Sequence, residues 1–322
     1  MRIAITGSIA FDYIMTYPGR FKEMLLAENL DSISVSFLVD EMTRHRGGVA
    51  PNIAYTLALL GERPILVGTA GMDFDVYKAA LEEVGVDTSG TRIYEDLYTA
   101  SFFVSTDSQQ AQIAMFYTGA MARSRDLSLA EAVEGTPDLV VISPNDPVAM
   151  RNLIAECKER GIPYMYDPSQ QVARVTGEEL AEGVDGAYIL ITNEYEYKAL
   201  TRKTGFTHDD LMERAGTVIV TRGENGTDIY TDTDVYHIPA VAPSVLRDPT
   251  GVGDAFRGGL LKGLAAGWGW ELSGRVGALA ATYALEQVGT QNHAYTRREF
   301  VERFRQHFDD GGLLDSMLDE DE

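Results

Sequence analysis

Residues 248–259 read Asp-Pro-Thr-Gly-Val-Gly-Asp-Ala-Phe-Arg-Gly-Gly, and no other segment of the chain carries so specific a pattern. Gly251 and Gly253 are separated by one residue, and an apolar run with helical spacing follows from Ala255 to Leu264. Consecutive backbone N–H groups at such a helix start can turn toward a bound anion. The segment therefore predicts a phosphate-binding cradle, although a tight glycine turn with an N-capping aspartate would use the same residue types.

Asp254 lies at the mouth of this predicted cradle. Its carboxylate would repel a bound anion there, so a purely binding role does not explain its position. A carboxylate beside a phosphoryl group is suited to work as a proton acceptor. Asp254 is therefore the candidate general base.

Residues 248–256 resemble the C-terminal signature of the ribokinase-like (pfkB) carbohydrate and nucleoside kinases, and the resemblance extends through most of the chain. It implies that the backbone N–H groups of Gly251, Val252 and Gly253 stabilise the transferring phosphoryl group. It also implies that Asp254 takes the proton of the acceptor hydroxyl. Three further segments are similar to the bacterial and archaeal nucleoside (adenosine) kinases, namely residues 7–12, 118–121 and 254–261.

The implied activity is ATP-dependent transfer of the γ-phosphoryl group to the 5′-hydroxyl of a nucleoside such as adenosine. A ribokinase-like sugar kinase stays open as an alternative, because a nucleoside and a free sugar present the same ribose hydroxyls. A non-catalytic small-molecule sensor on the same fold is the alternative from another class. The aspartate beside an intact Gly-x-Gly argues against a sensor, since sensing needs no base.

Strand and helix patterns alternate after residue 138, and such βα units predict a parallel sheet with helices on both faces. The resemblance implies a ribokinase-like three-layer α/β/α domain with a mostly parallel central sheet and a small β-sheet lid. We expect the main domain to comprise residues 1–12, 45–95 and 119–314, the lid residues 13–44 and 96–118, and a solvated acidic tail residues 315–322.

Three segments alternate with a period of two, which is typical of half-buried strands: residues 30–39, 99–105 and 112–117. The last two are joined by the polar turn 106–110 and predict a hairpin. A lid built from these segments would exclude water during transfer. Its apolar surface for a base or sugar could come from Phe102, Met115 or Phe116, depending on a strand register that the pattern leaves open. The exposed face of the lid sheet could also pair with a second subunit to form a homodimer.

Acidic residues dominate the composition, with a formal net charge of -22 over 322 residues. Such a charge disfavours nucleic acid and anionic membrane surfaces as partners. The single Cys157 allows no intrachain disulfide. No charged leader opens the chain, and no apolar run approaches the ~20 residues that span a bilayer, so a cytoplasmic protein is expected.

The acceptor site is expected around Asp12, which follows the apolar strand predicted at residues 2–6, because ligands of open α/β sheets bind beyond strand ends. The resemblance implies that this aspartate holds two sugar hydroxyls. Gly47, Gly48 and Asn52 match the family's Gly-Gly-x-x-x-Asn signature, although a paired glycine is by itself more often a simple turn. Gln170, after another strand, is a further candidate contact with the acceptor.

The nucleotide site is expected near Asn193 and Glu196, which resemble the family's Asn-x-x-Glu motif. The resemblance implies that Glu196 helps to hold Mg²⁺ through water, whereas the same spacing is also an ordinary helix cap. The remaining implied sites are a turn at the nucleotide phosphates and ribose (Thr221, Gly223 and Gly226), the surroundings of adenine (Asn292) and a monovalent cation such as K⁺ (Asp248).

Other enzyme classes lack their motifs in this chain. No Gly-x-x-x-x-Gly-Lys-Ser/Thr occurs, which excludes a Walker-type kinase. Phe256 stands where a dinucleotide-binding fingerprint would need its third glycine. Neither Gly-x-Ser-x-Gly nor His-Glu-x-x-His is present, so a serine hydrolase or a zinc peptidase is not supported.

Overall fold

The computed structural model describes residues 1–25 and 34–318. Within these residues, nine strands form a central sheet in the order β13-β12-β11-β10-β9-β8-β1-β4-β5. The pairing is parallel from β5 to β11, and β12 and β13 add an antiparallel edge. The sheet comprises β1 (Ile3–Thr6), β4 (Ile65–Gly71), β5 (Thr91–Tyr94), β8 (Leu139–Ile142), β9 (Tyr164–Tyr166), β10 (Ile189–Asn193), β11 (Val218–Thr221), β12 (Thr227–Tyr230) and β13 (Val235–Ile238). The mostly parallel sheet predicted from the βα pattern is confirmed.

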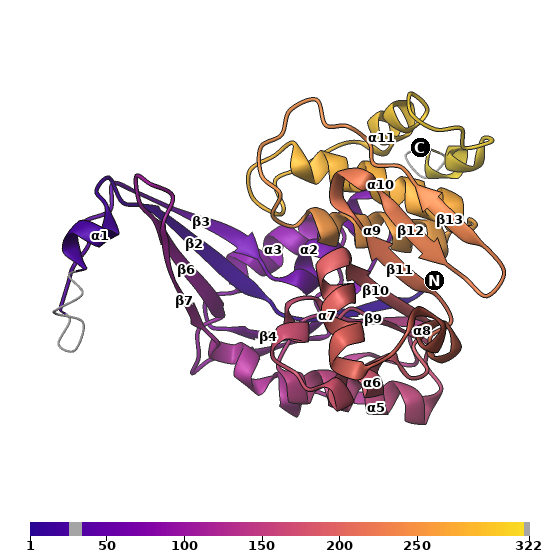
Figure 1. The fold of residues 1–322 in the computed structure, drawn as a ribbon, viewed down its shortest axis with the longest axis horizontal. Helices are drawn as coiled ribbons and strands as arrows, with labels where there is room; N and C mark the ends of the chain where they lie inside the picture. Colours follow the sequence, from indigo (N-terminus) through magenta and orange to yellow (C-terminus); the bar gives the residue numbers. More distant parts are fainter. Residues whose placement is uncertain (26–33, 319–322) are drawn as a thin grey trace.

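Helices cover both faces of this sheet, which makes three layers (Figure 1). One face carries α2 (Val49–Leu59), α3 (Asp75–Glu83), α9 (Val252–Ala265), α10 (Trp270–Leu285) and α11 (Arg297–Phe304). The other carries α4 (Leu129–Ala132), α5 (Pro147–Arg160), α6 (Gly177–Val184), α7 (Glu194–Thr204) and α8 (His208–Arg214). Short 3₁₀ helices span Gly119–Asp126, Ser169–Ala173, Gly223–Asn225 and Leu313–Met317.

The strand β8 shows why both faces must be covered. Leu139 and Val141 point into the core beneath α2 and α9, whereas Val140 and Ile142 point into the core beneath α5. All four side chains are fully buried. A strand that is apolar at consecutive positions can bury every side chain only between two helical layers.

A separate four-stranded sheet, the lid, has the order β3-β2-β6-β7. Figure 1 shows it projecting from one side of the main domain, with α1 (Phe21–Met24) near its tip. Its hairpin of β6 and β7 confirms the one predicted from the sequence. The lid strands are β2 (Ala10–Thr16), β3 (Glu41–Gly47), β6 (Ala100–Thr106) and β7 (Gln112–Tyr117).

The prediction of a strand at residues 30–39 is wrong for the part of this segment that the structure describes. Residues 34–39 form no strand, residues 30–33 lie outside the described residues, and the strand instead runs from Glu41 to Gly47. Phe37 packs against Tyr17 and Phe21 in an aromatic cluster near α1, which explains an apolar residue there without a strand. β3 is mostly polar on both faces, so it carries no apolar alternation that periodicity could detect.

Two other expectations also need correction. Residues 10–12 and 45–47, assigned to the main domain, lie inside the lid strands β2 and β3, so Asp12 is a lid residue. The solvated tail predicted from residue 315 is wrong for its first residues, because the 3₁₀ helix Leu313–Met317 buries Leu314 and Met317 completely and Asp315 pairs with Arg305. Residues 319–322 of that tail lie outside the described residues. None of the helices in the described part of the chain combines the length and apolarity that crossing a bilayer requires.

Candidate active site

Gly251 begins the predicted cradle as the N-cap of α9, with φ of +76°. This left-handed conformation favours glycine, and a Cβ at this position would lie 2.9 Å from the Cβ of Thr290. No side chain caps the first turn of α9. The Val252 N–H makes only a long bond of 3.5 Å to the Pro249 carbonyl, so the N–H groups of this turn and the helix dipole favour an anion at this end. The alternative of an aspartate N-cap does not hold for α9.

Asp254 lies in the first turn of α9, and its carboxylate Oδ2 accepts a hydrogen bond of 2.8 Å from Nδ2 of Asn52. The residue as a whole is partly exposed, but its carboxyl group is buried. Burial of the carboxyl group raises the pKa of Asp254 to about 7, although the Arg257 charge and the Asn52 hydrogen bond both act to lower it. A carboxyl group with a pKa near neutrality, in the first turn of a helix without a side-chain cap, has the properties of a general base.

A chain of hydrogen bonds fixes the Asn52 amide from behind. Nε2 of Gln291 donates to Oδ1 of Asn52 over 2.8 Å and also to the hydroxyl of Tyr77, which in turn donates to the Gly47 carbonyl over 2.9 Å. The Asn52 oxygen is thus occupied, and its amino group must face Asp254. Neither Tyr77 nor Gln291 was predicted as a site residue, because a tyrosine on an amphipathic helix and a glutamine in a loop carry no distinctive pattern.

Asp12 and Gly47 lie next to each other in the lid sheet. A Cβ on Gly47 would fall 2.3 Å from Oδ2 of Asp12, so the carboxylate lies over bare backbone. Burial raises the pKa of Asp12 to about 6, while His45 acts to lower it and Asp248 adds to the rise. Gly48 has φ of +95°, and a Cβ there would meet the Ser8 carbonyl at 2.4 Å. The paired glycines therefore make room for Asp12 and for the turn from β3 into α2.

Arg257 and Asp167 form a buried ion pair behind the cradle that the sequence analysis did not anticipate. Nη2 of Arg257 donates to Oδ1 of Asp167 over 2.7 Å, and Nη1 donates to the Gly253 carbonyl over 2.9 Å. Burial raises the pKa of Asp167, although the Arg257 charge acts to lower it. The arginine inside the apolar run of residues 255–264 was the available signal, because a charge there needs a buried partner.

Asn193 and Glu196 form a capping box at the start of α7. The Asn193 side chain accepts from the Glu196 N–H, and Oε2 of Glu196 accepts from the Asn193 N–H, each over 2.8 Å. Glu196 is buried, and that burial raises its pKa. Among the described residues, no group of three or more His, Cys, Asp or Glu side chains could hold a metal ion. A Mg²⁺ ion bound to nucleotide phosphates and water needs only one or two protein carboxylates, and Glu196 fits that requirement.

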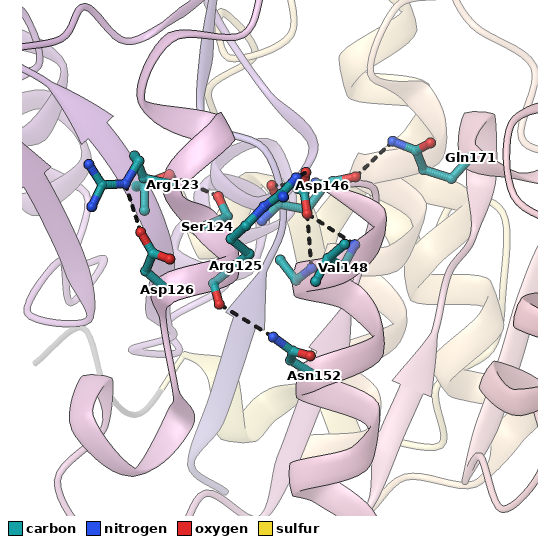
Figure 2. A network of polar contacts seen from close by, with 11 residues as sticks. Arg123, Ser124, Arg125, Asp126, Asp146, Val148, Asn152 and Gln171 are labelled. Atoms are coloured by element: carbon teal, nitrogen blue, oxygen red, sulfur yellow. Dashed lines mark hydrogen bonds and ion pairs between the residues drawn. The ribbon is translucent and has the colours of Figure 1, made fainter.

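Gln170 is exposed on the 3₁₀ helix Ser169–Ala173, whereas its neighbour Gln171 is buried. Figure 2 shows Gln171 reaching toward the start of α5, where its Nε2 donates to the Asn145 carbonyl over 2.7 Å. Asp146 caps α5 and pairs with Arg125 in the same network. This network anchors the segment and leaves Gln170 free at its surface.

The remaining predicted residues shape turns and loops. Gly223 and Gly226, after Thr221 at the end of β11, have φ of +57° and +85°, and a Cβ on Gly226 would meet the Ile238 carbonyl at 2.2 Å. Asp248 accepts from the backbone N–H groups of Thr250 and Gly289. Asn292 donates to the Val288 carbonyl and lines a cavity of about 460 Å³ together with Thr43, Arg44, His45, Arg46, Thr290 and Gln291.

A three-layer α/β domain with a β lid, and a carboxylate of raised pKa in the first turn of a glycine-capped helix, is the arrangement expected of a phosphotransferase with an alcohol acceptor. Residues 4–297 match the sequence model of the pfkB family carbohydrate kinases, and the chain belongs to this family.

Nucleoside kinases are among the similar proteins. That of Methanothermobacter thermautotrophicus is 30% identical over 92% of this chain and 94% of its own length, and that of Methanocaldococcus jannaschii is 28% identical over 95% and 97%. The solved structure of Burkholderia thailandensis nucleoside kinase in complex with inosine is 36% identical, covers 95% of this chain and 98% of its own, and superposes with a TM-score of 0.82.

Proposed function

We propose that this protein is an ATP-dependent nucleoside kinase that phosphorylates the 5′-hydroxyl of a nucleoside such as adenosine. The observation that carries the proposal is the hydrogen bond from Asn52 to Asp254 at the open N-terminus of α9. It holds a carboxyl group with a pKa of about 7 where an alcohol could meet a phosphoryl group. Relatives named as nucleoside kinases, one of them solved with ADP-inosine, support this acceptor and a nucleotide donor.

The lid supports a nucleoside over a free sugar. Asp12 pairs in register with Phe102, and Phe102 pairs with Phe116, so all three side chains lie on one face of the lid sheet. Met115 pairs with Phe103 and belongs to the opposite face. Two aromatic rings on the same lid face as the carboxylate that would hold the ribose suit a planar nucleobase, whereas ribose alone offers nothing to pack against them.

In this proposal, Asp12, Gly47, Gly48 and Asn52 align the ribose, and Asp254 accepts the proton of the 5′-hydroxyl. The N–H groups of Gly251, Val252 and Gly253 receive the charge of the γ-phosphoryl group as it moves in line. Asn193, Thr221, Gly223, Gly226 and Asn292 would bind the nucleotide, with Gln170 at the acceptor. Glu196 would hold Mg²⁺ through water, and when bound this ion would offset phosphate charge. Asp248 would contribute to a K⁺ site.

Release of ADP should be measured with adenosine, inosine, guanosine, cytidine, ribose and fructose 6-phosphate as acceptors, with Asp254→Asn as the control for unrelated hydrolysis. We expect turnover with at least one nucleoside and little with ribose. A response confined to ribose or fructose 6-phosphate would favour the ribokinase-like alternative, and no turnover with saturating nucleotide binding would favour a sensor.

We also propose that two copies of the chain pair through the lid face opposite Asp12. That face carries the exposed apolar side chains Met42, Met115 and Tyr117, which lie in register with Met15, Phe103 and Ser101. Light scattering should give about twice the monomer mass, and Met42→Glu with Met115→Glu should return the monomer. A monomer for the wild-type chain at micromolar concentration would refute this pairing.

A further inference from the structure

The Arg257 guanidinium joins two elements of the main domain at the point where the cradle begins. It lies one helical turn after Gly253 in α9 and donates from Nη1 to the Gly253 carbonyl over 2.9 Å. Its other edge faces Asp167, directly after β9, with Nη2 to Oδ1 at 2.7 Å and Nε to Oδ2 at 2.6 Å. Arg257 is 5% exposed and Asp167 is 0% exposed.

A buried ion pair is an unfavourable way to fill a protein core, because both charges lose their hydration. Removing two charges from water costs several kcal/mol, and apolar residues of similar volume often give equal or greater stability. The neighbours of Arg257 on α9 are apolar and buried, among them Phe256, Leu260 and Leu261. Packing alone would thus be served by an aliphatic side chain at position 257. The guanidinium adds a defined hold on one peptide group, that of Gly253.

We propose that Arg257 and Asp167 are positioning residues for phosphoryl transfer, which fix the Gly253 peptide and hold the first turn of α9 against the end of β9. The inference rests on the proposed function of the cradle. A planar guanidinium that donates from both Nη atoms, one to Asp167 and one to the Gly253 carbonyl, sets both the distance and the orientation of that carbonyl, whereas an ammonium sets neither. A cradle that stabilises charge only in the transition state depends on such preorganisation.

The pair also acts on the charge of Asp254, with opposite signs for its two members. The Arg257 charge lowers the pKa of Asp254, and the Asp167 charge raises it. The charged and polar groups that influence Asp254 come from several elements, namely Arg257 on α9, Asp167 after β9, Glu196 on α7 and Asn52 on α2. The Asp254 charge in turn acts on Tyr77 of α3, whose pKa it helps to raise. The acid limb, meaning the pH range in which turnover falls as Asp254 becomes protonated, should therefore move to higher pH when Arg257 alone is neutralised. It should move to lower pH when Asp167 alone is neutralised.

The test compares turnover, KM and pH profile among Arg257→Lys, Asp167→Asn and the double variant Arg257→Met with Asp167→Leu. The double variant leaves neither member of the Arg257–Asp167 pair without its partner and is expected to fold with near wild-type thermal stability. We expect its kcat to fall about 10- to 100-fold, the scale for misplaced reacting groups, with acceptor KM within about threefold. For Arg257→Lys we expect a lower kcat with the acid limb near its wild-type pH. In Asp167→Asn the limb should move to lower pH.

Lys262→Met is the matched control, because Lys262 is also buried on α9 and pairs with Glu62, away from the cradle. It should lower stability and leave kcat within about twofold. Wild-type-like kcat in a folded double variant would overturn the inference while leaving the proposed function intact. Should the wild-type chain phosphorylate none of the acceptors, the proposed function fails. The same variants are then compared by calorimetry for AMP-PNP and ADP binding, where a selective loss of AMP-PNP affinity supports the hold on the cradle and unchanged affinity overturns it.

Discussion

The side-chain amide of Asn52 on α2 donates to the carboxylate of Asp254 on α9 over 2.8 Å, although the two residues are 202 positions apart in the chain. Gln291 accounts for the orientation of this amide, since its own amide occupies the Asn52 oxygen. The carboxylate is therefore held at the start of α9 by a group that cannot rotate away without losing a buried hydrogen bond. The first four predictions concern this arrangement and the cradle beside it.

Asp254→Asn should keep the fold and lose turnover on the order of 10²-fold or more, the usual effect of removing a positioned base. The amide is isosteric with the carboxylate but cannot accept a proton from the acceptor hydroxyl. Steady-state ADP release would report the loss, and far-ultraviolet circular dichroism would report the fold. A folded variant with near-full turnover would contradict the assignment of the base.

The thermal stability of the protein should depend on pH, because folding raises the pKa of the Asp254 carboxyl group. Its pKa is about 7 in the folded chain against an ordinary value of 3.8, so between these values the folded state binds the proton more strongly than the unfolded state. The contribution of this carboxyl group to stability is therefore present below about pH 4 and is lost as pH rises through about 7. Relative to Asp254→Asn, wild-type thermal stability should fall across this range. A difference between the two melting temperatures that stays constant from pH 4 to pH 8 would refute the raised pKa.

Gln291→Leu should reduce kcat by about tenfold, because the loss of one buried hydrogen bond of roughly 1 kcal/mol releases the Asn52 amide. The amide can then turn its oxygen toward Asp254 and repel the carboxylate. Gln287→Leu is the control, since Gln287 is an exposed residue just after α10. Equal kinetics for Gln291→Leu and Gln287→Leu would show that the amide chain has no effect on turnover.

Gly253→Val should abolish productive phosphate binding. Gly253 is exposed in the first turn of α9, where a branched side chain would stand in front of the N–H groups, and its Cβ would lie 3.0 Å from Nη1 of Arg257. Isothermal titration with ADP and AMP-PNP, together with turnover, would measure the effect. Unchanged affinity and turnover would count against a phosphate cradle at this position.

Phe116→Ala and Met115→Ala form a matched pair on β7, because adjacent residues of a strand face opposite sides of the lid sheet. Phe116→Ala should raise KM for adenosine by about fivefold, corresponding to the roughly 1 kcal/mol of an aromatic contact. Met115→Ala should leave that KM unchanged. Equal effects of the two substitutions would place the nucleobase elsewhere.

The local part of the site was predictable from the sequence. Gly251 and Gly253 before an apolar helical run, with Asp254 between the glycines and that run, already specify a helix start without a side-chain cap and a carboxylate in its first turn. The βα alternation after residue 138 likewise specified a parallel sheet with two helical layers, because apolar side chains at consecutive strand positions must be covered on both faces.

Where the residues had no local signature, prediction failed. β3 was placed too early because Glu41–Gly47 is polar and lies in a lid that is solvated on much of its surface. Tyr77, Gln291, Asp167 and Arg257 were not identified as site residues, since each acquires its role only from a partner distant in the chain.

The sequence by itself determined the glycine-led start of α9, its adjacent acid and the layered α/β architecture, because backbone conformation and strand or helix periodicity depend on residues close together in the chain. Only the tertiary structure decided what holds Asp254, which aromatic rings share a face with Asp12, and that Arg257 is paired with Asp167. Hydrogen bonds and ion pairs between elements depend on the packing of the whole domain and on strand register, and neither is encoded in a local pattern.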